Sequence, residues 1–300
     1  MIRIGTRKSA LALWQANEVK NQLESFGHSC KLVLIESNGD QNLTQPLYAM
    51  GIQGIFTKSL DTALLNSTID IAVHSLKDVP TKLPKGIGLN AMLPRGNAND
   101  LVVYGPKFKG WEAQTKIGSG SLRRKAQWLG KYPHHTLENL RGNLEKRMEK
   151  LENSDWSGAI FAQAGLERMD LLNGHYEVLD WMIPAPAQGV IGIASLENNP
   201  SLKSIVRKIN CSNTALCAHI ERSFLSVLEG GCTAPIGAIA KINGETLHFK
   251  GGLFSLDGTI ALTVEEEINI KKVKEFGEKI AIKILREGGK RLMAQIKSEF

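Results

Sequence analysis

The sequence predicts an α/β protein with two lobes, each built on a mostly parallel sheet, and a small C-terminal α+β domain. Three observations predict this class. Strand and helix patterns alternate over the first 73 residues, and the alternation resumes after residue 100. From residue 233 the pattern changes to strands joined by Asn-Gly and Asp-Gly turns, which are strong hairpin signals. A chain of 300 residues is also long enough for several domains.

The first lobe is predicted from the N-terminal alternation. Ser9 suits a helix N-cap, and apolar residues follow it near helical spacing. Residues 37–55 show little periodicity and contain several glycines; a connection of that length is typically a functional loop or lid. The expected strands are residues 2–5, 31–36 and 69–73, and the expected helices are about 9–26 and 56–66.

The second lobe repeats this alternation. Its expected strands lie near residues 101–103, 116–118, 135–137 and 159–161, and its expected helices near 122–130, 144–152 and 164–172. Two prolines, Pro184 and Pro186, then break the chain before another apolar strand at 189–193. We therefore assign residues 1–95 and about 190–212 to the first lobe and residues 96–189 to the second.

The C-terminal domain is predicted to span residues 213–300. It opens with a helix over 214–228 that ends at two glycines. The expected strands are 235–241, 246–251 and 259–264, and a final helix presents apolar residues on one face at Val273, Phe276, Ile280 and Ile284.

Composition excludes several classes of protein. Hydrophobic residues make up 42% and charged residues 22% of the chain, as in an average globular protein, so wholesale disorder and a coiled coil are excluded. No apolar run approaches the ~20 residues that span a bilayer, and the charged N-terminus does not resemble a secretory signal. We expect a cytoplasmic protein that binds no membrane. We also expect a monomer, because no extended apolar helix face is left without a partner.

The net charge of +7 is concentrated in two segments that differ in kind. Residues 271–300 are rich in lysine on a helical pattern, which is usually a solvated face. Residues 119–147 are rich in arginine among glycines and serines. Clustered guanidinium groups beside such turns more often face a bound anion, because they grip carboxylate or phosphate with two hydrogen bonds.

An anion site is predicted at the turn from Gly118 to Arg124. The turn joins a strand to a helix, so it offers free backbone N–H groups and the positive end of the helix dipole, together with Ser119 and Ser121. Arg123 and Arg124 add two guanidinium groups. A simple serine-capped surface helix is the alternative. Further arginines follow the next strands of this lobe, and ligands gather beyond the strand ends of such sheets: Arg141, Arg147 and Arg168.

In the first lobe, polar residues follow the apolar strand that ends at Val73. Ser75, Lys77 and Asp78 are expected at the ligand crevice. Asp78 is the only acid in an otherwise basic set. Such a carboxylate can bind an N–H group, stabilise a developing cation or move a proton. A structural Lys–Asp pair in a surface turn is the alternative.

Cys232 is the one cysteine of four that suggests chemistry. It follows a helix end and two glycines, so its side chain is expected to project from a loop, where a thiolate can hold a group covalently. No histidine stands nearby, which favours covalent anchoring over acyl transfer. A buried structural cysteine is the alternative. No cysteine or histidine spacing indicates a metal site, and none is expected.

These segments together resemble the porphobilinogen deaminase family, also called hydroxymethylbilane synthases. The resemblance covers nearly the whole chain in order. It is carried by short matches at residues 4–9, Trp14-Gln15, 70–80, 118–124, 140–143, 164–166, Gln188-Gly189, 228–232 and 235–237. The resemblance implies two lobes similar to those of periplasmic binding proteins and a third domain that carries the cysteine.

The resemblance also implies a transferase reaction, in which four porphobilinogen molecules condense head to tail with release of ammonia and give the linear tetrapyrrole hydroxymethylbilane. The chain would grow on a dipyrromethane cofactor attached to Cys232 by a thioether, with Asp78 as the catalytic residue. The cofactor contacts implied are Ser75, Lys77, Asp78, Ser119, Ser121, Arg123, Arg124, Arg141 and Gln188, and the substrate contacts implied are Arg7, Gln15, Arg147 and Arg168.

Four positions depart from the family pattern: Gln53 stands in place of a lysine, Gly120 of a serine or threonine, Ala187 of a glycine and Ala194 of a glutamate. None removes Asp78, Cys232 or the arginines, so activity is still expected.

Two rival functions are considered. A non-catalytic anion-binding protein would share the two basic lobes, and a nucleic-acid-binding protein would share the net charge. Neither explains a Gly-Gly-Cys loop together with Asp78, and no nucleic-acid partner is expected.

Overall fold

The computed structural model describes residues 1–36, 57–172, 174–228 and 234–299, and the chain divides into two compact units. Unit 1 comprises residues 1–43, 52–97 and 188–216, and unit 2 comprises residues 44–51, 98–187 and 217–300. Within the described ranges, no helix has the length and apolar character needed to cross a membrane. The division into three domains stays a prediction.

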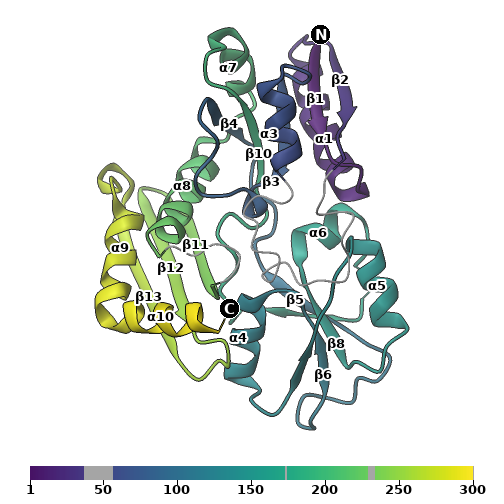
Figure 1. Ribbon diagram of the computed structural model, residues 1–300, viewed down its shortest axis with the longest axis vertical. Helices are drawn as coiled ribbons and strands as arrows, with labels where there is room; N and C mark the ends of the chain where they lie inside the picture. The colour runs from purple at the N-terminus through teal and green to yellow at the C-terminus, as the bar shows by residue number, and fades with distance from the viewer. Residues whose placement is uncertain (37–56, 173, 229–233, 300) are drawn as a thin grey trace. The chain divides into compact units, whose positions relative to one another are not determined.

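Unit 1 is built on a five-stranded sheet in the order β2-β1-β3-β10-β4 (Figure 1). Strand β1 pairs in parallel with β2 and β3, whereas β10 pairs antiparallel with β3 and β4. The strands are β1 (Ile2–Thr6), β2 (Cys30–Leu34), β3 (Ile71–Ser75), β4 (Ile87–Met92) and β10 (Ile191–Leu196). The helices are α1 (Ala10–Ser25), α3 (Lys58–Leu65), the 3-10 turn η2 (Leu76–Asp78), α7 (Pro200–Arg207) and the start of α8 (Ser212–Val227).

Helices cover both faces of this sheet, because alternate side chains of a strand point to opposite faces. Ile71 and Val73 of β3 pack in one apolar cluster with residues of α1 and α7. Ala72, between them, packs in a second cluster with Leu60 and Leu64 of α3. The sheet is therefore buried on both sides, and only its edges and strand ends are open for binding.

Unit 2 contains a second five-stranded sheet, in the order β7-β6-β8-β5-β9, and a three-stranded sheet, β11-β12-β13. Strand β6 pairs in parallel with β7 and β8, whereas β5 pairs antiparallel with β8 and β9. The strands are β5 (Asp100–Tyr104), β6 (Lys116–Gly118), β7 (Thr136–Glu138), β8 (Gly158–Ala162), β9 (Tyr176–Leu179), β11 (Ile236–Asn243), β12 (Thr246–Phe254) and β13 (Ala261–Asn269). The helices are α4 (Leu122–Lys131), α5 (Leu144–Glu152), α6 (Gln163–Arg168), the rest of α8, η3 (Ile270–Lys272), α9 (Phe276–Ile284), η4 (Leu285–Gly289) and α10 (Lys290–Ser298).

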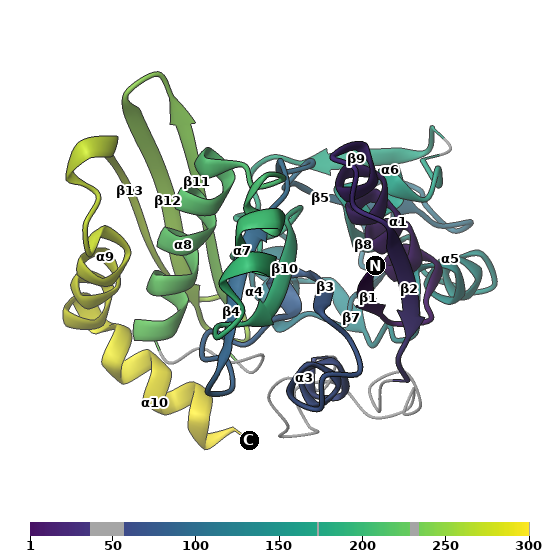
Figure 2. The same cartoon turned by 90° about the horizontal axis from the view of Figure 1, so that it is seen from above.

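The three-stranded sheet is covered by helices on one face, as Figure 2 shows for α8 and α9. Phe249 of β12 packs edge-on against Phe224 of α8, with ring centroids 5.2 Å apart, and against Phe276 of α9 at 6.1 Å. On the opposite face, His248 lies 2.7 Å from Glu267 of β13. This alternation of aromatic and charged side chains is what a half-buried antiparallel strand requires.

The predicted α/β class and the small antiparallel C-terminal sheet are confirmed. The expectation of mostly parallel lobe sheets is confirmed for strand direction, because only β10 in the first five-stranded sheet and only β5 in the second run opposite to the other four described strands. The prediction missed β4, β9 and α7. The expected final helix is confirmed as α9, although it begins at Phe276 and leaves Val273 before it. The helix α10 was missed; Gly288, with a φ of +114° that helical residues do not have, separates it from α9.

Candidate functional site

In unit 1, the predicted site residues gather where parallel strands β1 and β3 end. Arg7 follows β1 directly, and Ser75 closes β3. The turn η2 then carries Lys77, which is half-buried, and Asp78, which is exposed. Because parallel strands end at the same edge of a sheet, these side chains share one edge, as the sequence predicted.

Hydrogen bonds connect this edge to α1 and to the segment before β10. The Gln15 side-chain amide donates to Ser75 Oγ at 2.8 Å, and the Ser75 hydroxyl lies 3.2 Å from Gln15 Oε1. Lys77 Nζ donates to Gln188 Oε1 at 3.4 Å. Arg95, which the sequence analysis did not single out, donates from Nη1 to the Gln188 carbonyl at 3.3 Å. Gln15, Ser75, Lys77 and Gln188 are therefore brought together within one unit.

His74 stands directly before this edge in β3 and is 7% exposed. Burial, assisted by the positive charge of Arg7, lowers the pKa of His74 from 6.5 to about 4. The imidazole is therefore neutral at neutral pH, so it adds no positive charge beside Asp78.

In unit 2, the turn after β6 leads directly into helix α4, and its anion site stays a prediction. Ser121 is the N-cap of α4, and its hydroxyl accepts a hydrogen bond from the Arg124 N–H at 3.5 Å. Ser119 is buried, and its Oγ accepts from the Ser121 N–H at 3.3 Å. The positive end of the α4 dipole points toward this turn, which favours negative charge there.

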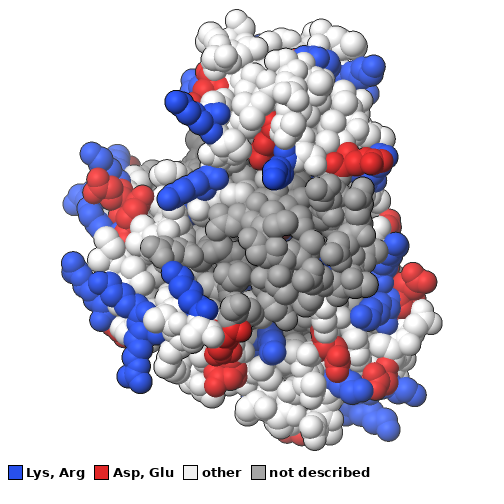
Figure 3. Space-filling model, in the orientation of Figure 1, with Lys and Arg blue, Asp and Glu red and all other residues white. Residues whose placement is uncertain are grey.

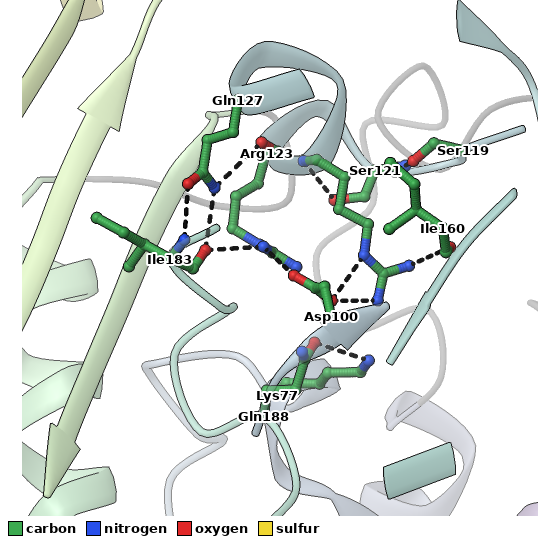
Figure 4. Close-up of polar contacts among 10 residues, drawn as sticks. Lys77, Asp100, Ser119, Ser121, Arg123, Gln127, Ile160, Ile183 and Gln188 are labelled. Carbon is green, nitrogen blue, oxygen red and sulfur yellow. Dashed lines mark hydrogen bonds and ion pairs between the residues drawn. The ribbon is translucent and has the colours of Figure 1, made fainter. Parts of the chain in front are cut away.

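Arg123 and Arg124 share the buried carboxylate of Asp100, the first residue of β5 (Figure 4). Arg123 Nη1 lies 2.6 Å from Asp100 Oδ2, and Arg124 Nη2 lies 2.8 Å from Asp100 Oδ1. The expectation that Asp78 is the only acid in the basic set is therefore wrong. Asp100 was missed because its partners are distant in the sequence; its place directly before an apolar strand was the only local signal.

The other predicted arginines of unit 2 follow the neighbouring strands. Arg141 lies in the turn after β7, and burial lowers its pKa. Arg147 of α5 folds back on that turn and donates from Nε to the Gly142 carbonyl at 2.8 Å. Arg168 is the last residue of α6, which follows β8. All three are half-buried, and they extend the basic groups along one edge of the sheet.

The turns after β6 and β7 are in backbone contact at Gly120. A Cβ atom at this position would lie 2.5 Å from the Leu140 carbonyl oxygen. We expect Gly120→Ala to lower the free energy of unfolding by about 1–3 kcal/mol, because a backbone atom cannot move aside as a flexible side chain can. Urea unfolding monitored by circular dichroism measures this change.

Gly88→Ala is the matched control, because the nearest atoms to a Cβ there belong to the flexible Glu197 side chain. Equal stability losses in the two variants would contradict the argument. The same contact explains why a serine or threonine at position 120 would not fit this conformation.

Two other departures from the family pattern have structural consequences. Ala187 adopts φ +61°, a left-handed conformation that costs alanine about 1 kcal/mol more than glycine. Its N–H donates to the buried Glu221 carboxylate of α8 at 2.6 Å, which holds it in place. Ala194 is fully buried in the cluster around α3, where an unpaired glutamate would be costly. Gln53 and Cys232 lie outside the described residues.

The lysine-rich C-terminal segment carries exposed ion pairs. Lys283 lies 2.7 Å from Glu266, and Lys271 lies 2.8 Å from Glu245. Figure 3 shows acidic side chains among the basic ones over these elements. This mixture is typical of a solvated surface, and isolated exposed pairs of this kind add at most about 1 kcal/mol of stability.

Residues 2–204 match the family model "Porphobilinogen deaminase, dipyromethane cofactor binding domain", and residues 215–286 match "Porphobilinogen deaminase, C-terminal domain". Curated proteins named porphobilinogen deaminase are similar throughout. That of Geotalea uraniireducens is 38% identical, covering 98% of this chain and 94% of its own length. That of Desulforamulus reducens is 37% identical, with 99% and 98% covered.

Among solved structures, the methionine binding protein shows a TM-score of 0.45 and 12% identity, with 69% of this chain and 89% of that protein covered. A similarity this weak adds nothing to the argument.

Proposed function

The chain belongs to the porphobilinogen deaminase family, and we propose the roles that its own residues play in that family's reaction. The enzyme is a transferase that condenses four porphobilinogen molecules head to tail, releases ammonia and yields hydroxymethylbilane. Each substrate ring carries an acetate and a propionate group. A growing product therefore accumulates carboxylates, and the site must supply positive charge for them.

The residues at the α4 turn fit the dipyrromethane cofactor that this family carries. Arg123 uses only Nη1 in its hydrogen bonds within the described part of the chain, so Nε and Nη2 are donors for a cofactor carboxylate. Ser119 and Ser121 offer hydroxyl groups at the same turn. When bound, the cofactor supplies the nucleophilic pyrrole carbon on which the product grows. We propose Cys232 as the residue that holds it, through a thioether.

Asp78 is proposed as the catalytic residue. Loss of ammonia from porphobilinogen leaves an electrophilic azafulvene cation, and a carboxylate lowers its energy by direct electrostatic stabilisation. Asp78 is exposed at the end of β3, so a bound ring can reach it. The same carboxylate can accept a hydrogen bond from a pyrrole N–H and take up the proton that leaves after each condensation.

The remaining polar residues are proposed to position carboxylates. Further contacts with the cofactor are assigned to Ser75, Lys77, Arg124, Arg141 and Gln188, and contacts with incoming substrate to Arg7, Gln15, Arg147 and Arg168. A hydrogen bond to a charged partner contributes about 1.5–3 kcal/mol. Several such bonds on each ring hold the reacting carbons in the geometry of attack, which is where much of the rate acceleration arises.

One observation carries this proposal. In each unit the predicted groups lie beyond the ends of neighbouring parallel strands, Asp78 in unit 1 and the Ser119–Arg124 turn in unit 2. The test is to incubate the purified chain with porphobilinogen and measure ammonia and hydroxymethylbilane together. We expect four molecules of ammonia for each tetrapyrrole, in keeping with four condensations. Substrate binding without ammonia release would instead favour the anion-binding alternative. We also propose that the enzyme is cytoplasmic, as its family generally is, and monomeric.

A further inference from the structure

Asp100 is a fully buried carboxylate that holds two adjacent guanidinium groups. Its Oδ2 accepts from Arg123 Nη1 at 2.6 Å. Its Oδ1 accepts from Arg124 Nε at 2.9 Å and lies 2.8 Å from Nη2 of the same residue. Figure 4 shows the carboxylate lying between the two arginine side chains. Because β5 pairs antiparallel with β8, this first residue of β5 lies at the edge where β8 ends.

A backbone carbonyl accepts a further hydrogen bond from each guanidinium. Arg123 Nη1 also donates to the Ile183 carbonyl at 2.8 Å, and Arg124 Nη1 donates to the Ile160 carbonyl at 2.9 Å. Gln127 holds Ile183 in turn, since its amide accepts from the Ile183 N–H at 2.7 Å and donates to the Ile183 carbonyl at 3.0 Å. Each guanidinium therefore has one orientation, set between a carboxylate and a carbonyl.

Charge explains why a carboxylate is required at this position. Both arginine side chains are at most 7% exposed, and two neighbouring buried cations repel each other strongly. Asp100 reduces the charge of the cluster from +2 to +1. The cluster then keeps a net charge of +1, which attracts an anionic ligand. Nε and Nη2 of Arg123 are the donors that can form hydrogen bonds with that ligand.

We propose that Asp100 is the positioning residue that presents Arg123 and Arg124 to a carboxylate of the pyrrole chain, an inference that rests on the function proposed above. Asp100 does not touch the reacting atoms. It acts by fixing the direction of the guanidinium groups and by setting the cluster to a net charge that suits a single carboxylate side chain.

The test uses chains produced in cells that cannot make porphobilinogen and then incubated with it. The intact mass of the denatured protein reports covalent attachment of two rings, and circular dichroism reports folding. For Asp100→Asn we expect a melting temperature lower by about 10 °C, because a buried ion pair has lost one partner. At a temperature where the variant is folded, we expect the rate of attachment to fall at least about tenfold, as loss of a charge-assisted contact implies.

Asp155→Asn is the matched control, because this aspartate also binds a basic residue, Lys116 at 2.7 Å, but is exposed. It should attach two rings at the parental rate. A folded Asp100→Asn chain that also does so would overturn the proposal. If the parent chain itself gains no mass, the proposed function fails instead, so the two failures are distinguishable.

A double variant, Asp100→Asn with Arg124→Gln, restores the charge of +1 without restoring the carboxylate. If Asp100→Asn does not fold, the double variant is compared with the single variant Arg124→Gln, which also lacks the Arg124 guanidinium but keeps Asp100. Attachment by a folded double variant that is slower than in Arg124→Gln supports positioning of Arg123 by Asp100. Attachment as fast as in Arg124→Gln would show that the Asp100 carboxylate positions nothing, and failure of the double variant to fold would show that Asp100 serves the fold rather than the site; either result overturns the proposal.

Discussion

Asp78→Asn is expected to lower the turnover number at least about a hundredfold, the contribution typical of a general acid or base. The asparagine amide keeps the shape of the side chain. However, it carries no negative charge to stabilise a developing cation and cannot take up a proton at neutral pH. Asp78 is exposed in the turn η2, so the substitution should cost little stability.

Steady-state assays with porphobilinogen measure this effect, and the intact mass shows whether the cofactor is attached. We expect the two-ring mass to persist in Asp78→Asn while turnover is lost, because attachment depends on Cys232 and the basic groups. Asp155→Asn, an exposed aspartate on the other unit, serves as the control and should turn over normally. Near-normal turnover of Asp78→Asn would show that this carboxylate is not the catalytic group.

Cys232→Ser is expected to abolish covalent attachment completely. A serine hydroxyl is a far weaker nucleophile than a thiolate and does not form the thioether under these conditions. The parent chain should show a mass excess equal to two linked pyrrole rings after incubation with porphobilinogen. Further steps of one ring each should appear with excess substrate, and the variant should keep the mass of the bare polypeptide throughout.

Cys30→Ser is the matched control for this experiment, because Cys30 is a free and partly exposed thiol. Burial raises its pKa, so it is a poor nucleophile at neutral pH. The control should gain mass like the parent. Equal gain in Cys232→Ser would place the linkage on another residue, and a parent chain that never gains mass would favour a non-catalytic anion-binding protein.

Local sequence signals predicted most helices well. Helix α1 begins after Ser9, whose hydroxyl caps it, and α5 spans the predicted residues with Asn143 as its N-cap. An N-cap interacts with backbone N–H groups within three residues, so it can be recognised from the local sequence alone. Strands β4 and β9 were missed because a strand is stabilised by neighbours that can be far away in the sequence. The direction of β10 also depends on distant neighbours, because it is set by antiparallel pairing with β3 and β4.

The candidate site likewise has parts that local sequence predicted and parts that depend on distant contacts. The Ser119–Arg124 turn and the Asp78 turn were predictable, because each combines a strand end, a turn and charged residues within a few positions. The amino-acid sequence by itself thus determined the family and the reaction, and it predicted which groups carry it. Only the tertiary structure showed that Asp100 holds both arginines, that Gly120 meets Leu140 and that Glu221 holds Ala187. These contacts join residues 20 or more positions apart, and only the folded chain brings them together.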